Sequence, residues 1–77
     1  MTTAQRRARE KAEKRREILE AAREVFFQKG VHRATMDDVA ARAEVAKGTL
    51  YLYFQSKEEI LAHLLLEGLS IQDGEAL

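Results

Sequence analysis

The stretch that decides the fold is residues 35–54, TMDDVAARAEVAKGTLYLYF. Its apolar residues recur at the spacing of two short helices joined by a tight turn. Two apolar faces oppose each other, formed by Val39, Ala40 and Ala43 in the first helix and by Val45, Leu50 and Phe54 in the second. An alanine at the crossing point lets two helices approach closely at a steep angle. This pattern is typical of a helix-turn-helix.

The second of these helices, expected over residues 47–54, carries polar groups away from its apolar face. They are an ammonium group, a bare stretch of backbone and three hydroxyls, from Lys47, Gly48, Thr49, Tyr51 and Tyr53. Such groups suit phosphates and base edges, and they suit a protein core badly. Because the second helix of a helix-turn-helix enters the major groove, the residues favour a DNA-binding domain.

A longer stretch of the chain resembles a known family. The run VAKGTLYLYFQSKEEIL at residues 45–61 follows VFFQKG at residues 25–30 and TMDDVA at residues 35–40. In order and spacing these segments resemble the N-terminal DNA-binding domain of the tetracycline-repressor (TetR) family, from about Ile18 to Leu65. The resemblance implies an all-α fold, namely a three-helix, homeodomain-like helix-turn-helix bundle followed by the start of a fourth helix.

The resemblance also implies a function, which is sequence-specific binding of double-stranded operator DNA by a transcriptional regulator, expected to be a ligand-responsive repressor. Matched position by position, the family's DNA contacts fall on Thr35, Lys47, Gly48, Thr49, Tyr51, Tyr53 and Lys57. The alternative role of Tyr51 and Tyr53 is packing in a half-buried position. The alternative for Lys47 and Lys57 is that each is a solvated surface lysine. Family members carry a larger C-terminal domain that forms a homodimer and binds a small-molecule effector, and we expect this chain to be truncated before that domain.

Two positions depart from the family pattern. Glu44 stands in the turn where relatives commonly have glycine, and Ala46 stands where they have serine or a similar cap. A non-glycine residue with positive φ costs on the order of 1 kcal/mol, and a lost serine cap costs about 1 kcal/mol. Neither is large enough to abolish the motif, but Ala46 lacks a hydroxyl for phosphate.

The charge is zero overall and unevenly distributed. Residues 1–16 carry seven cationic and two acidic side chains, a net +5, whereas residues 58–77 carry five acidic side chains and no cationic ones. Only the basic end suits phosphate, so Arg6, Arg7 and Arg9 are candidate DNA contacts. The alternative for this segment is a solvated, charged start of the first helix.

Three segments follow from these patterns. Residues 1–16 form a basic arm that is partly disordered, over residues 1–8, or extends the first helix. Residues 17–69 form the DNA-binding domain, and residues 70–77 form a loose tail. The first helix ends near Lys29 with Gly30 as its positive-φ stop, and its apolar face consists of Ile18, Ala22, Val25 and Phe26.

Polar residues mark two further helix starts. Thr35 with Asp38 predicts a capping box at the start of a helix that ends near Ala43, and Ser56 with Glu59 predicts another. The fourth helix that follows Ser56 is expected to bury a stripe made of Ile60, Leu61, Leu64, Leu65 and Leu69.

Composition restricts the other function classes. The chain has no cysteine, two distant histidines and no glycine-rich phosphate loop, so we expect no metal, no cofactor, no catalytic residue and no enzymatic activity. No apolar run reaches the roughly 18 residues of a membrane span, and a soluble, cytoplasmic protein is expected. The alternative function is a small helical protein–protein interaction module that docks through the leucines of the fourth helix.

Overall fold

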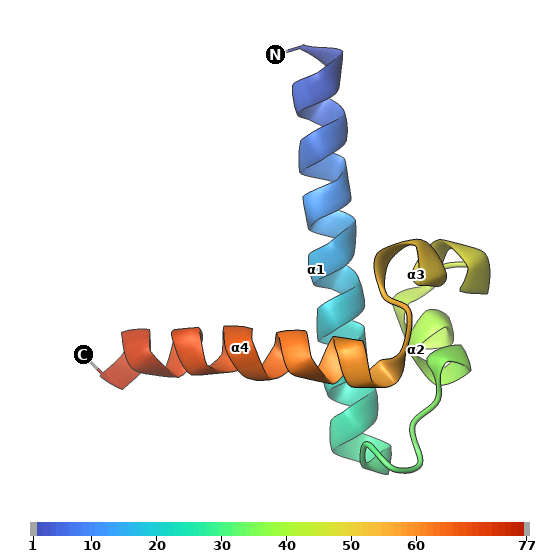
Figure 1. Ribbon diagram of the computed structural model, residues 1–77, viewed down its shortest axis with the longest axis vertical. Helices are drawn as coiled ribbons and strands as arrows, with labels where there is room; N and C mark the ends of the chain where they lie inside the picture. The colour runs from blue at the N-terminus through green and yellow to red at the C-terminus, as the bar shows by residue number, and fades with distance from the viewer. Residues whose placement is uncertain (1, 77) are drawn as a thin grey trace.

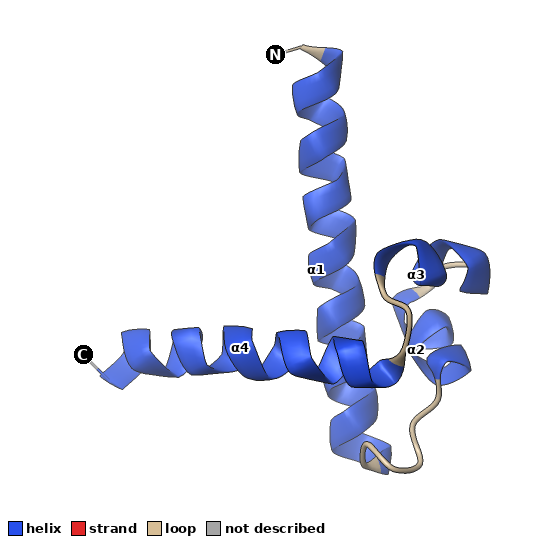
Figure 2. Cartoon of the chain, in the orientation of Figure 1, coloured by secondary structure: helices blue, strands red, loops and turns tan. Residues whose placement is uncertain are grey.

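The computed structural model describes the backbone of residues 2–76 and the side chains of residues 2–67. Four helices follow one another, and no strand occurs among the described residues (Figures 1 and 2). Their bounds are Thr3–Lys29 for α1, Met36–Ala43 for α2, Lys47–Tyr53 for α3 and Lys57–Ala76 for α4. The predicted all-α, helix-turn-helix architecture is therefore confirmed. Within the described part of the chain, no helix is both long enough and apolar enough to cross a membrane.

One core lies where α2, α3 and the start of α4 pack on the second half of α1. The face predicted for α1 is buried as expected, with Ile18 and Ala22 fully covered. The other helices cover it with Val39, Ala40, Leu50, Phe54 and Ile60. Removal of this apolar surface from water stabilises the fold by about 25 cal/mol for each square ångström.

The N-terminal half of α1 is helical but takes no part in the core. Thr2 and Gln5 form a capping box, in which Gln5 N donates to Thr2 Oγ1 at 3.2 Å and Thr2 N donates to Gln5 Oε1 at 3.0 Å. None of the side chains of residues 2–17 is buried, and this half projects beyond the bundle (Figure 1). The backbone is helical from Thr3 onward, and the capping box satisfies the first backbone donors of this helix.

The start of α2 is fixed by the predicted capping box. Asp38 N donates to Thr35 Oγ1 at 3.1 Å, and Thr35 N donates to Asp38 Oδ2 at 3.0 Å. Lys29 Nζ also donates to Asp38 Oδ1 at 3.0 Å. The hydrogen bond from Lys29 and those from Thr35 lower the pKa of Asp38 from its ordinary value of 3.8, so this carboxylate stays ionised and ties the end of α1 to the start of α2.

The turn between α2 and α3 contains the strained residue expected from the sequence. Glu44 has φ 58° and ψ 43°, in the left-handed region. Its N–H donates to Ala41 O at 3.2 Å, and Val45 N–H donates to Ala40 O at 3.0 Å, which is the hydrogen-bond pattern of a Schellman motif. These two bonds satisfy carbonyls at the end of α2 and set the direction in which α3 departs. Ala46 caps α3 with no side-chain hydrogen bond.

Helix α4 differs from the prediction in two respects. Ser56 Oγ accepts from Glu59 N at 3.2 Å, but the Glu59 carboxylate accepts from Gln55 N at 3.4 Å, so the reciprocal half of the box is displaced by one residue. Leu65 is not buried: it is 60% exposed, because α4 crosses α1 (Figure 1) and its described core contacts end at Leu64. The backbone is helical to Ala76, which includes most of the segment predicted as a loose tail, residues 70–77. The side chain of Leu69 lies outside the described residues.

Two leucines of α3 provide a test of this core. Leu50 is fully buried, whereas Leu52, two residues later in the same helix, is 83% exposed. We predict that Leu50→Ala lowers the free energy of unfolding by about 2–5 kcal/mol, because it leaves a cavity. Leu52→Ala should change it by less than about 0.5 kcal/mol. Urea unfolding followed by circular dichroism measures both, and similar midpoints for the two variants would show that the assigned core is wrong.

Candidate nucleic-acid interface

Burial of Leu50 determines which side of α3 faces solvent. Successive residues of an α-helix are about 100° apart, so Gly48 lies on the side opposite Leu50. An added Cβ at Gly48 would meet no other described atom within 4 Å. Tyr51 is 38% exposed, whereas Thr49 and Tyr53 are half-buried, and Tyr53 packs against the core. The helix therefore presents an open backbone surface flanked by hydroxyl groups.

Lys47, the first residue of α3, is held by a carboxylate of the preceding helix. Its Nζ lies 3.0 Å from Asp37 Oδ1, and both side chains are largely exposed. The hydrogen bond and the charge of Asp37 raise the pKa of Lys47 above its ordinary value of 10.5. The side chain is therefore a cation at neutral pH, and its present partner is an anionic oxygen of the kind that a phosphate also offers.

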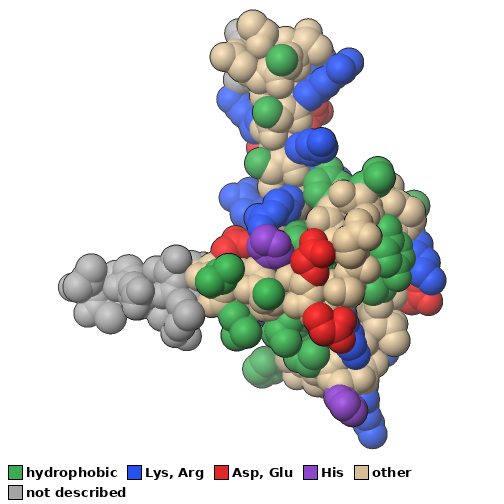
Figure 3. Space-filling view, in the orientation of Figure 1, with side chains coloured by type: hydrophobic (Ala, Val, Ile, Leu, Met, Phe, Trp, Pro, Cys, Tyr) green, Lys and Arg blue, Asp and Glu red, His purple; other side chains and the backbone are tan. Residues whose placement is uncertain are grey.

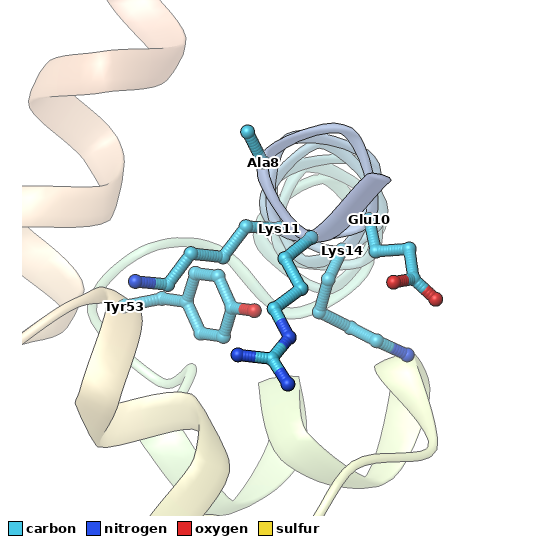
Figure 4. A pocket seen from close by; sticks show the side chains of 6 residues that line it. Ala8, Glu10, Lys11, Lys14 and Tyr53 are labelled. Atoms are coloured by element: carbon cyan, nitrogen blue, oxygen red, sulfur yellow. The ribbon is translucent and has the colours of Figure 1, made fainter. Parts of the chain in front are cut away.

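The projecting half of α1 brings further cations next to α3. Arg7, Lys11 and Lys14 line an open groove together with Glu10 and Tyr53 (Figure 4). Lys and Arg side chains project from both sides of this part of α1, with a few acidic ones among them (Figure 3). Positions 7, 11 and 14 repeat at helical spacing and so share one face of α1. That spacing is visible in the sequence, yet Lys11 and Lys14 were not among the predicted contacts.

The three predicted arginines do not lie together. Arg7 lines the groove beside Tyr53, whereas Arg9 lines a second hollow with Arg16 and Glu67. Two residues along a helix correspond to about 200° around its axis, so Arg7 and Arg9 point in nearly opposite directions. Arg6 is exposed and lines neither hollow. Because the N-terminal half of α1 is helical, its cationic side chains point in different directions, and only some of them lie on the side of α3.

Lys57 has an environment that the sequence did not indicate. Its Nζ donates to the carbonyl oxygens of Val31 at 2.8 Å, His32 at 3.1 Å and Ala34 at 3.0 Å. An ammonium group has three protons, and all three are used here within the protein. Lys57 therefore fastens the loop that leads to Thr35 onto the start of α4. Its contact with phosphate stays a prediction, and the structure adds this positioning role.

Thr35 combines exposure with a fixed orientation. The residue is exposed at the N-terminus of α2, and its Oγ1 accepts from Asp38 N. A hydroxyl that accepts one hydrogen bond still has its own proton to donate. Since Lys57 holds the adjacent carbonyl of Ala34, the loop before α2 is tied down on the other side. Thr35 is thus a pre-positioned donor at the N-terminus of a helix, the end at which phosphates bind.

These features define a class of protein. Two short helices pack through a left-handed turn, and the second exposes a polar face beside a basic helical arm, which is the arrangement of a helix-turn-helix DNA-binding domain. The model for the family "Bacterial regulatory proteins, tetR family" matches residues 18–64. The chain belongs to this family and carries the helix-turn-helix domain of its transcriptional regulators.

Individual relatives agree with this assignment. The chain is 42% identical over 59 residues to the fatty acid metabolism regulator protein of Bacillus subtilis, which covers 77% of this chain and 30% of the relative. It is 43% identical over 61 residues to the regulator TtgR of Pseudomonas putida, which covers 78% of this chain and 29% of the relative. The chain thus spans about 30% of the length of these curated relatives.

Solved structures show the same fold. The fatty acid degradation regulator FadR of Bacillus halodurans superposes with a TM-score of 0.70 at 40% identity, covering 74% of this chain and 30% of that one. A TetR-family transcriptional regulator of Haemophilus influenzae superposes with a TM-score of 0.72 at 31% identity, and the match covers 79% of this chain and 33% of that one. Neither these structures nor the sequence relatives support the alternative of a protein–protein interaction module.

The role of Lys57 is testable by removing its ammonium group. We predict that Lys57→Met, which keeps most of the apolar stem, lowers the free energy of unfolding by about 1–3 kcal/mol, because three carbonyls lose a charged donor. Lys47→Met is the matched control, since the ammonium of Lys47 contacts one exposed carboxylate, and it should leave the urea midpoint unchanged. Equal midpoints for the two variants would contradict the positioning role.

Proposed function

We propose that this chain binds a specific double-stranded DNA operator, with α3 in the major groove and the N-terminal half of α1 along the phosphate backbone. The observation that carries the proposal is the groove in which Tyr53 of α3 meets three cations of α1, which outnumber the one acidic side chain there, that of Glu10. A DNA-reading helix needs both base-edge contacts and phosphate contacts to fix its register. The chain acts by binding in this proposal, and no catalytic step is involved.

Each proposed contact has a distinct chemical task. Gly48 allows the backbone of α3 to come close to the floor of the major groove. Thr49 and Tyr51 offer hydroxyls to the edges of the bases there. Thr35 and Lys47 are placed at helix starts, where phosphates bind. The remaining phosphate contacts are the proposed roles of Tyr53, Lys57, Arg6, Arg7 and Arg9, to which we add Lys11 and Lys14.

We further propose that the whole protein is a cytoplasmic, homodimeric repressor whose affinity for DNA depends on a small-molecule effector. Support comes from relatives that are about three times as long as the matched segment and are named as regulators. One further relative, FasR of Mycolicibacterium smegmatis, is named a transcriptional activator. A reporter gene downstream of the operator distinguishes repression from activation. Repression is supported if expression of the reporter rises when the gene for this protein is deleted.

The phosphate contacts lead to a prediction about salt. Each neutralised phosphate contributes about −0.9 to the slope of log affinity against log salt, and we expect a slope between roughly −2 and −5 for one domain. The variant Arg7→Gln, Lys11→Gln, Lys14→Gln, which removes the cations of the groove beside Tyr53, should flatten that slope by up to about 3 and weaken preferred and random duplexes by the same factor. Fluorescence anisotropy at several salt concentrations measures both effects. An affinity that does not change with salt would exclude this mode of binding.

Base reading leads to a separate prediction. Thr49→Ala should cost about 1–3 kcal/mol on the preferred duplex and relax selection at one base pair. On random duplex it should change affinity little, because phosphate contacts dominate there. Competition binding with single-base variants of the preferred site gives the profile. If the loss is equal on both duplexes, Thr49 contacts the backbone and does not read a base.

A further inference from the structure

Leu52 occupies an unusual place on α3. It lies two residues after the buried Leu50 and four after Gly48, so Gly48 and Leu52 share the side of the helix that points away from the core. Its side chain is 83% exposed, more than twice the exposed fraction of Tyr51. Single exposed leucines are common on protein surfaces, so the exposure alone is no argument. The position is the argument, because this side faces the DNA in the proposed function.

The chemistry of the major groove matches such a residue. Each base pair presents hydrogen-bonding groups there, and the C5-methyl of thymine is the apolar group among them. Leucine has no donor or acceptor, so it cannot read any of the polar groups. Gly48, one turn earlier on the same side, lets the backbone approach closely, which brings the Leu52 isopropyl group toward the floor of the groove. Thr49 and Tyr51 lie on either side of these two residues around the helix.

We infer that Leu52 reads sequence in the operator by packing on the C5-methyl group of a pyrimidine, which is thymine in ordinary DNA. This inference rests on the proposed function and adds a specificity-determining residue to it. Burial of one methyl group is worth roughly 0.8 kcal/mol, which is about a fourfold change in affinity. Selection at that base pair is therefore expected to be modest and to depend on shape and not on hydrogen bonding.

The test uses the 77-residue chain and a preferred duplex selected from a randomised library. Each thymine of that duplex is replaced in turn by deoxyuridine, which removes the methyl group and keeps the hydrogen-bonding edge. One replacement should weaken binding about fourfold. With Leu52→Ala, the same replacement should have no effect, while affinity for the thymine duplex falls. Leu65→Ala is the matched control: Leu65 is also exposed but lies on α4, and this variant should keep the full deoxyuridine penalty.

A second comparison isolates the methyl group from the rest of the base. At the sensitive position, a 5-methylcytosine–guanine pair should bind the unaltered chain about fourfold more tightly than a cytosine–guanine pair, and Leu52→Ala should abolish that difference. If deoxyuridine weakens binding equally with and without Leu52, the inference is overturned and the proposed function stands. If no sequence is enriched from the library and random duplex does not bind, the proposed function falls and the inference falls with it.

Discussion

The burial of one face of α3 in the core that it shares with the other helices constrains every other part of this structure. Leu50, Val39 and Ile18 are all fully covered, and α3 has only seven residues with which to hold its place. A helix of two turns has almost no stability of its own in water, so its orientation comes from this contact. Because Leu50 points into the core, Gly48 and Leu52 on the opposite side of the helix point toward solvent. Core packing and the surface offered to DNA are thus two consequences of one contact.

Polar groups also hold the two connections on either side of α2, beside the apolar contacts that Val31, Ala34 and Val45 make there. The loop after Gly30 carries carbonyls that no helix satisfies, and the Lys57 ammonium group binds three of them. Glu44 adopts a left-handed backbone conformation, and the N–H groups of Glu44 and Val45 then donate to carbonyls at the end of α2. Unpaired buried backbone groups are costly, which explains why these two short connections are so closely tied. Both precede an element of the candidate interface, at Thr35 and at Lys47.

Helix α1 serves two purposes along its length. Its second half supplies the core, and its first half carries cations into the groove beside Tyr53. At the boundary, the Arg15 guanidinium donates to His63 Nδ1 at 2.9 Å, lies 3.5 Å from Glu67 Oε2 and stands over the ring of Phe54. These contacts join α1 to α4 at the point where α1 leaves the bundle. The direction of the basic arm is therefore tied to the direction of α4.

Features that depend on residues three or four apart were readable from the sequence: the helices, the capping box of α2 and the buried face of α1. Residues at this spacing are neighbours on any helix, so their contacts are readable before the fold is known. The stop at Gly30 was readable as well, because glycine adopts positive φ without strain. Tertiary structure decided the contacts of Lys57 and Arg15, whose partners lie 23 or more residues away along the chain. It also decided the exposure of Leu65, because the crossing of α4 over α1 determines how far its apolar stripe is covered, and no local pattern encodes that crossing.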